Sequence, residues 1–343
     1  MLTVLESLNS ALHRAFTDSV NVYLLGEDVS DPYGGAFKVT RGLSTRFPDR
    51  VLTTPISEAG FVGVATGMAL RGLRPVVEIM FGDFTSLIAD QVINHIAKFR
   101  WMYNDQVTLP IVIRTPMGGR RGYGPTHSQT LEKLFMGIPG LTVVAPAALS
   151  RKDGSGNPGD LLYQSILESE EPTLFIENKL QYLLPIQSQL DLEDFIVTTD
   201  PSTKGSIPLT YILTIRGAPP ASLTITAYGY IAELAKQAVA RLAYEHEIFV
   251  ELVVPTQLSP FLVEPMISSV SHSGALLTVE EGTYTLGWGA EVLARVAGAL
   301  GTHKVKYQRL AAKEVPTPAS GPLEAEALPG VENIIQSALQ MKL

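Results

Sequence analysis

The sequence contains no cysteine among its 343 residues, which excludes disulfide bonds, thiolate nucleophiles and thiolate metal sites. It also lacks any uncharged apolar run of the roughly 18 residues that a membrane-spanning helix needs. Its first residues show neither the basic start nor the apolar block of a secretory signal. We therefore expect a protein of the cytoplasm, or of an equivalent reducing space, with no membrane partner.

Charged residues are scarce as well. They make up 17% of the chain, against 45% hydrophobic residues, and the formal net charge is −8. There is no basic domain and no interleaving of basic and aromatic residues, so the composition argues against a nucleic-acid partner. A chain of this length exceeds one comfortable hydrophobic core, which predicts two domains. A weakly charged surface is also typical of a protein that other subunits partly cover.

The first half of the chain alternates expected helices with expected strands. A capping box at Thr3 and Glu6 predicts a helix at the start, and residues 84–102 carry a longer helical pattern. The intervening strands are apolar throughout, as in a parallel sheet that is covered on both faces. We expect these strands at residues 22–26, 51–53, 76–80, 111–114, 141–145 and 173–177.

Two irregular stretches follow. Residues 150–159 are rich in Gly, Pro and Ser and predict an exposed loop, and residues 179–221 contain five prolines and predict an extended linker. A second α/β unit then begins, with strands expected at residues 223–228, 248–254, 276–280 and 305–309. The predicted fold class is α/β with two doubly wound sheets, divided into a domain of residues 1–178, a linker of residues 179–221 and a domain of residues 222–343.

The stretch of residues 54–78 combines a carboxylate with a glycine-rich helix. Ser57 is placed as the helix N-cap, where its hydroxyl would accept a backbone amide proton, and Glu58 follows in the first turn. Three glycines share one helix face and cost roughly 1 kcal/mol each relative to alanine, which predicts another backbone close to that face; they are Gly60, Gly63 and Gly67.

Two interpretations of Glu58 are open at this point. Acidic residues in a first helical turn commonly do no more than offset the helix dipole. The sequence after Glu58, however, is almost wholly apolar or small, which is typical of a buried helix. A carboxylate at the start of such a helix would be buried with it and would need a partner.

Ligands of doubly wound sheets bind at the carboxyl ends of the strands, where three segments of this chain are expected to meet. Glu27 follows the first strand, Phe84 follows the third, and His127 lies in the glycine-rich and arginine-rich loop of residues 117–129. A lone histidine is more often structural than catalytic, so both roles of His127 stay open. Phe84 could equally be an ordinary core residue.

Five segments resemble the beta subunit of thiamine-diphosphate-dependent 2-oxoacid dehydrogenases, the decarboxylating components of the pyruvate, branched-chain 2-oxoacid and acetoin dehydrogenase complexes. The resemblance runs from about Leu8 to Ile335. It implies a transketolase-like pyrimidine-binding domain followed by a domain like the C-terminal domain of transketolase. The five segments are PISEAGFVGVATGMALRGLRPVVE, DQVINHIAKFRWM, THSQ, EEGTYTLGWGAE and EVPTP.

The resemblance also implies roles for the site residues. Glu58 matches the glutamate that bonds a ring nitrogen of the cofactor's aminopyrimidine and favours the imino tautomer, which takes the proton from the thiazolium carbon to give the ylid. Phe84 matches the aromatic residue that packs on the aminopyrimidine, and we expect Glu27 to contribute to cofactor binding. His127 matches a histidine near the substrate that is implicated in acyl transfer to a lipoyl arm.

The magnesium motif of this superfamily, Gly-Asp-Gly, does not occur in the sequence. The resemblance therefore implies that this chain holds half of a cofactor site and no metal ligand, while an alpha subunit supplies the magnesium site in an α2β2 heterotetramer. The other implied partners are a lipoyl acyltransferase component and a small 2-oxo acid.

Some residues depart from the family pattern. Residues 255–260 replace a usual Arg-Thr segment, and Ser169 stands where relatives that bind a structural potassium ion often have Asp. These changes suggest a specialised complex. Two other functions stay open: half of a split transketolase-type transferase, and a non-catalytic scaffold of the same fold.

Overall fold

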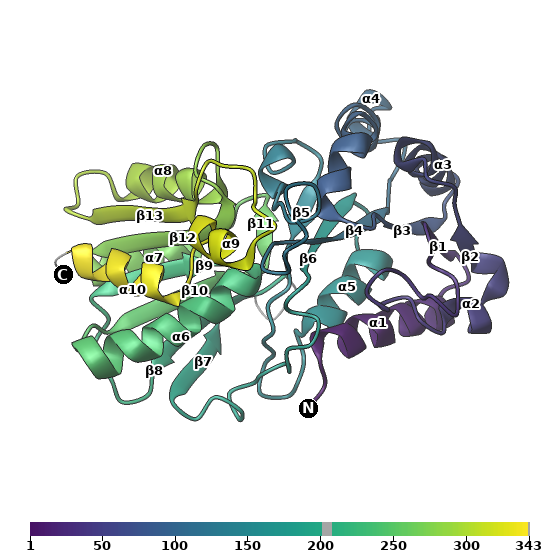
Figure 1. The fold of residues 1–343 in the computed structure, drawn as a ribbon. Helices are drawn as coiled ribbons and strands as arrows, with labels where there is room; N and C mark the ends of the chain where they lie inside the picture. The colour runs from purple at the N-terminus through teal and green to yellow at the C-terminus, as the bar shows by residue number, and fades with distance from the viewer. Residues whose placement is uncertain (201–207, 342–343) are drawn as a thin grey trace.

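A computed structural model describes residues 1–200 and 208–341. Within these residues the chain forms two sheets that lie beside each other (Figure 1). The first sheet has the order β11-β5-β6-β4-β3-β1-β2 and is parallel except at β11, which pairs antiparallel with β5. Its strands are β1 (Val22–Gly26), β2 (Val51–Thr53), β3 (Arg74–Glu78), β4 (Val112–Met117), β5 (Thr142–Val144), β6 (Thr173–Asn178) and β11 (Gln257–Ser259).

Neighbouring residues on these strands point to opposite faces of the sheet, as the pleat requires. One residue of each pair joins the core that contains α1 (Val4–Asp18) and α5 (Pro158–Leu167), and the next residue joins the core on the side of α3 (Glu58–Leu70). Both faces are therefore apolar, which explains why the strands show no alternation in sequence. Such pairs are Leu24 and Leu25, Val76 and Val77, and Val112 and Ile113.

The second sheet has the order β13-β12-β9-β10-β8-β7. Four of its strands are parallel, and β8 and β7 add an antiparallel edge. The strands are β7 (Phe195–Thr199), β8 (Thr210–Ile215), β9 (Leu223–Ala227), β10 (Val250–Pro255), β12 (Ala275–Thr283) and β13 (Lys306–Ala312). The α/β fold class with two sheets is confirmed, with the addition that each sheet carries antiparallel pairing at one edge.

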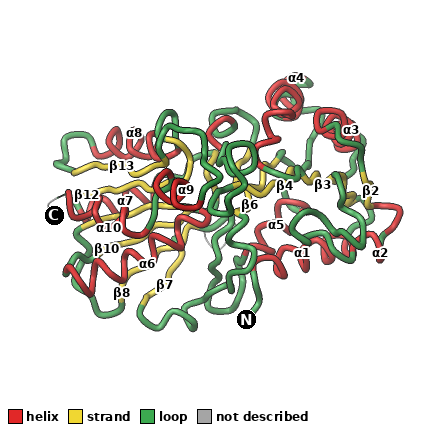
Figure 2. Tube along the Cα trace, viewed as in Figure 1, coloured by secondary structure: helices red, strands yellow, loops and turns green. Residues whose placement is uncertain are grey.

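Helices cover both faces of the second sheet (Figures 1 and 2). α6 (Gly229–His246) and α10 (Val331–Gln340) share one core with the sheet, while α7 (Glu264–Ser273) and α8 (Trp288–Leu300) pack on the other face. The short elements are α2 (Leu43–Arg46), η1 (Pro48–Arg50), η4 (Glu132–Leu134) and α9 (Gly321–Ala327). Among the helices of residues 1–200 and 208–341, none combines the length and apolar character that crossing a bilayer requires.

The stretch of residues 179–221 is not the extended linker that we expected. It contains β7 and β8, which continue the second sheet, while residues 201–207 of this stretch lie outside the described residues. The loop expected at residues 150–159 is also shorter, because Asn157 caps α5 by accepting hydrogen bonds from the amides of Gly159 and Asp160. The third strand runs over Arg74–Glu78, two residues ahead of its predicted position.

The prediction of a single helix over residues 84–102 is wrong. A 3₁₀-helix, η2 (Gly82–Ile88), is followed by a π-helix, η3 (Gln91–Ile96), and a short α4 (Phe99–Met102). The fully buried apolar residues here recur every four positions, at Ile88, Val92 and Ile96. A spacing of four residues is also that of one α-helical face, so the sequence pattern does not reveal the change of helix type.

The two sheets share one hydrophobic core. It extends from α3 through Met117 and Phe135 of the first half to Leu258 and Trp288 of the second. Glu132 of η4 is fully buried at this junction and accepts a hydrogen bond of 2.6 Å from the hydroxyl of Tyr228. Burial raises the pKa of Glu132 to about 7, and the nearby carboxylate of Glu280 also raises this pKa, against the hydrogen bond from Tyr228.

The raised pKa of Glu132 predicts a pH-dependent stability. The charged form is disfavoured in the folded state, so Glu132 lowers the free energy of unfolding as the pH rises from about 4.5 through about 7. Glu132→Gln should therefore raise the free energy of unfolding at pH 8, by roughly 3 kcal/mol more than at pH 5. Urea denaturation at both pH values measures this difference, with the exposed Glu193→Gln as control. An equal effect of Glu132→Gln at both pH values would contradict the argument.

Candidate active site at the carboxyl ends of the first sheet

The residues singled out from the sequence gather at one edge of the first sheet. Strands β4, β3 and β1 are neighbours and parallel, so their carboxyl ends lie side by side (Figure 1). Glu27 follows β1, Phe84 lies in η2 after β3, and His127 lies in the loop after β4. Glu58 begins α3, which packs against β3 and η2.

Glu58 is buried, as the sequence predicts, with 7% of its surface exposed. The predicted role of the Ser57 hydroxyl is wrong, because this side chain makes no capping hydrogen bond. The carbonyl oxygen of Ser57 accepts the first backbone hydrogen bond of the helix, from the amide of Phe61 at 3.0 Å.

Two carboxylates lie close together here. Burial raises the pKa of Glu27, and the charge of Glu58 raises it further. Oε1 of Glu27 is buried without a hydrogen-bond partner, and in the part of the chain that the structure describes the Glu58 carboxylate forms no hydrogen bond or ion pair. A buried acid and a half-buried acid without a cation form a site that is short of positive charge.

The glycine face of α3 is open within this chain. A Cβ added to Gly67 would meet no atom within 4 Å, and one added to Gly63 would meet only the Gln91 side chain at 3.6 Å. The helix is therefore not buried all round, contrary to expectation, and Val64 on the same side is 59% exposed. Trp101 on nearby α4 is 86% exposed. In residues 1–200 and 208–341, no backbone supplies the close approach that Gly63 and Gly67 predict.

Aromatic rings surround His127 and bring it together with Phe84. The ring centroid of His127 lies 5.4 Å from that of Phe84 and 4.8 Å from that of Phe81, both edge-on. Tyr123 extends this group, with its ring centroid 6.2 Å from that of Phe81. Such edge-on contacts stabilise ring orientation as well as burying apolar surface.

Buried charges hold the loop that carries His127. Glu281 of β12 accepts the amide of Gly119 at 2.7 Å, and Glu324 of α9 accepts the amides of Arg120 at 2.7 Å and Gly122 at 3.1 Å. Arg120 has a left-handed backbone with φ of 69°, which these bonds hold in place. The second domain thus shapes the site loop of the first.

Two further residues bind the other end of this loop. Asp83 accepts hydrogen bonds from Gln129, and Lys179 donates one to the carbonyl oxygen of His127. Sequence analysis missed these contacts. Asp83 lies beside Phe84 in the sequence, but Lys179 fell in the predicted linker, and only the pairing of β6 with β4 brings it to this site.

A buried ion cluster lies under the same edge. Arg114 of β4 is 1% exposed, pairs with Glu78 of β3, and forms a bidentate bond to Glu177 of β6 at 2.7 and 2.6 Å. Burial raises the pKa of Glu78, against the opposing charge of Arg114. Gly35 approaches so closely that a Cβ there would lie 2.5 Å from a carboxylate oxygen of Glu78, and its φ of 77° also favours glycine.

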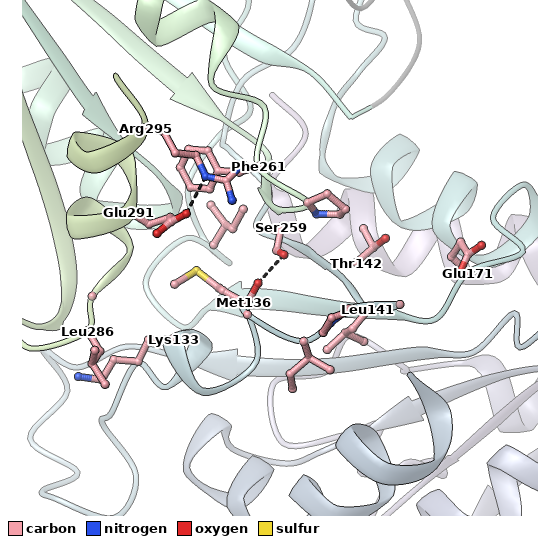
Figure 3. Close-up of a pocket in the computed structure, with 17 residues that line it drawn as sticks. Lys133, Met136, Leu141, Thr142, Glu171, Ser259, Phe261, Leu286, Glu291 and Arg295 are labelled. Carbon is pink, nitrogen blue, oxygen red and sulfur yellow. Dashed lines mark hydrogen bonds and ion pairs between the residues drawn. The ribbon is translucent and has the colours of Figure 1, made fainter. Parts of the chain in front are cut away.

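A cavity of about 710 Å³ lies elsewhere, at the junction of the two sheets (Figure 3). Met136, Leu141 and Thr142 face Phe261 and Arg295 across it. None of Glu27, Glu58, Phe84 and His127 lines this cavity, so the candidate site is separate from it. Among the described residues, no group of three or more His, Cys, Asp or Glu side chains is arranged to hold a metal ion.

Residues 1–183 match the family described as "Transketolase, pyrimidine binding domain", and residues 217–334 match "Transketolase, C-terminal domain". The chain is 35% identical to the "Pyruvate dehydrogenase E1 component subunit beta-1, mitochondrial" of Oryza sativa subsp. japonica, over 98% of this chain and 86% of that protein. It is 33% identical to the "Acetoin:2,6-dichlorophenolindophenol oxidoreductase subunit beta" of Cupriavidus necator, over 98% of this chain and 96% of that protein.

A solved structure described as "Split gene transketolase, inactive beta4 tetramer" shares the fold, with a TM-score of 0.73 over 99% of this chain and 98% of that one, at 19% identity. The higher identity to dehydrogenase and oxidoreductase subunits favours that function over half of a split transketolase. The chain belongs to the family of beta subunits of thiamine-diphosphate-dependent 2-oxoacid dehydrogenases.

Proposed function

We propose that this chain, together with an alpha subunit, oxidatively decarboxylates a 2-oxo acid and passes the acyl group to a lipoyl group. The observation that carries the proposal is the pair of neighbouring acids, half-buried Glu27 and buried Glu58, which has no cation among the described residues. An electron-poor heterocycle that binds with a protonated ring nitrogen would balance this charge. The aromatic group at Phe81, Phe84 and His127 offers flat surfaces for such a ligand at the same edge of the sheet.

Glu58 would bind a ring nitrogen of the aminopyrimidine of thiamine diphosphate, and Phe84 would pack on the ring. Glu27 would contribute the second negative charge of the site. When bound, this cofactor supplies the nucleophilic carbon that attacks the 2-oxo group. Glu58 would exchange a proton with the ring nitrogen, and its burial strengthens that interaction because few water molecules compete for the carboxylate.

The transfer step needs a proton at a second place. Carbon dioxide leaves in the decarboxylation that comes first. In the transfer that follows, the bond between the two lipoyl sulfurs breaks, one sulfur takes the acyl group, and the other keeps the electron pair of the broken bond and takes a proton. His127 would deliver that proton; its ring lies at the edge of the aromatic group and is partly exposed, which supports this role. The lipoyl group would come from an acyltransferase component.

The alpha subunit would bind on the open glycine face of α3. Gly63, Val64 and Gly67 leave room there for another helix backbone, and exposed Trp101 extends the apolar surface. We infer an α2β2 heterotetramer in which the alpha subunit supplies magnesium ligands, since the sequence has no Gly-Asp-Gly motif. The cytoplasm, or an equivalent reducing space, remains our expectation for where this assembly works.

Because this chain lacks the Gly-Asp-Gly magnesium motif, we expect that it does not bind thiamine diphosphate with useful affinity on its own. Isothermal titration calorimetry with the cofactor and magnesium should give no resolvable heat for the isolated chain. After mixing with the alpha subunit, the same titration should show binding, and light scattering should give the mass of a heterotetramer. Tight, magnesium-dependent binding to the isolated chain would overturn the half-site.

Glu58→Gln keeps the shape of the side chain but removes the charge that holds the ring nitrogen. In the reconstituted complex, decarboxylation with an artificial electron acceptor should fall by at least ~100-fold, as for loss of a positioned acid–base group. Thermal stability should not fall, because the change removes one of two neighbouring like charges. Glu264→Gln, in the exposed first turn of α7, is the matched control. Near-normal turnover in Glu58→Gln would show that Glu58 only offsets the helix dipole and has no catalytic role.

His127→Ala separates the two half-reactions. Decarboxylation should persist in part, while acylation of a lipoyl domain should fall at least ~100-fold, because only that step needs the histidine proton. The control is His272→Ala, an exposed histidine on α7. Equal loss in both assays would assign His127 to substrate or cofactor positioning instead.

A further inference from the structure

Two buried residues of opposite charge hold the peptide that carries His127. Lys179 is 0% exposed and donates from Nζ to the carbonyl oxygen of His127. Asp83 is 6% exposed, and its Oδ1 accepts from the side chain of Gln129 at 2.8 Å and from the amide of Gln129 at 3.3 Å. Hydrogen bonds to charged groups are roughly twice as strong as neutral ones. Residues 127–129 are therefore fixed at both ends.

Lys179 also contacts the rings beside His127. Its Nζ lies 5.4 Å from the ring centroid of Phe81 and 5.7 Å from that of Tyr123. The loop binds Lys179 in return, because the guanidinium of Arg121 donates to its carbonyl oxygen at 3.2 Å. The same ammonium thus touches the backbone of His127 and the aromatic rings that orient its side chain.

Burying a lysine at this position is not expected to stabilise the fold. Removing an ammonium group from water is costly, and apolar replacements of buried charges are often neutral or stabilising. No ion pair to Lys179 is found in residues 1–200 and 208–341, although Asp83, Glu281 and Glu324 lie near enough to interact with its charge. Oδ2 of Asp83 is itself buried without a hydrogen-bond partner.

We propose that Lys179 and Asp83 are positioning residues that set the orientation of His127 for acyl transfer. This inference rests on the proposed function of His127, but the fixing of residues 127–129 by Lys179 can be tested without it. Neither residue is assigned contact with the reacting atoms. Both act through the peptide that they bind.

The charge of Lys179 makes this arrangement sensitive to pH. Burial, together with the charge of Arg121, lowers the pKa of Lys179 to about 8, while the charges of Asp83 on η2, Glu281 on β12 and Glu324 on α9 oppose that decrease. Well below pH 8 the ammonium carries its full charge and the bond to His127 is strongest. The bond weakens as the pH rises through that value. Asp83→Asn removes one favourable charge and should move this loss to lower pH.

The first experiment uses the isolated full chain. Hydrogen–deuterium exchange should give protection factors for residues 118–129 that fall above about pH 8. In Lys179→Met, which replaces the ammonium by an apolar group of similar size, these factors should fall at least tenfold already at pH 7. In Asp83→Asn the fall should begin below pH 8. Lys152→Met, an exposed lysine in the loop before α5, should leave all of them unchanged.

The second experiment uses the complex with the alpha subunit, with the 2-oxo acids pyruvate and 3-methyl-2-oxobutanoate as probes. Lys179→Met should lower acylation of a lipoyl domain at least tenfold more than decarboxylation, and should remove the alkaline limb of the acylation rate. Unchanged protection factors in Lys179→Met, or equal loss in both assays, would overturn the proposal. A wild-type complex without decarboxylation would overturn the proposed function instead, while the exchange result would still stand.

Discussion

The buried pairing of Arg114 with Glu78 and Glu177 is the constraint on which the site edge depends. The three residues come from three adjacent strands: Glu78 ends β3, Glu177 precedes the last residue of β6, and Arg114 lies between them in β4. Buried charges are tolerated only with good geometry, and loss of one partner is strongly destabilising. The cluster therefore fixes how the three strand ends are aligned. The loops that carry Phe84, His127 and Lys179 leave the sheet from this fixed edge.

Charge is distributed unevenly around that edge. Glu27 and Glu58 put negative charge beside α3, whereas Lys179 puts a positive charge behind His127. Glu281 and Glu324, from the second domain, bind the amides of the loop between them. Each carboxylate that touches the loop meets backbone donors, while those near α3 meet none in the described residues. This contrast supports the proposal that Glu27 and Glu58 are available for a ligand.

The sequence predicts the strands of both sheets well, because apolar runs between helices leave few alternatives for Val22–Gly26 or Leu223–Ala227. It fails where tertiary contacts override local pattern. Residues 84–102 were predicted as one helix because buried positions four residues apart also share a face of an α-helix, whereas the structure has 3₁₀, π and α segments in succession. The strands β7 and β8 were missed because prolines and weak periodicity obscure an antiparallel edge.

The positions of the candidate site residues were predicted in outline for a similar reason. Glu27, Glu58 and Phe84 lie near strand ends or helix starts that the sequence marks directly, and His127 lies in the glycine-rich loop after β4. Lys179, Asp83, Glu281 and Glu324 act through hydrogen bonds to backbone groups, up to 204 residues away in the chain. Such contacts leave no periodic trace. Only the folded arrangement of the two sheets reveals them.

The core shared by the two sheets has a mechanical consequence. Met117, Phe135, Leu258 and Trp288 belong to one packed cluster that joins the two halves. Packed interiors do not deform continuously, so one sheet cannot rotate on the other without opening this cluster. A hinge inside the chain is therefore disfavoured. Any large movement during turnover must occur between whole subunits, with each beta chain moving as a rigid body.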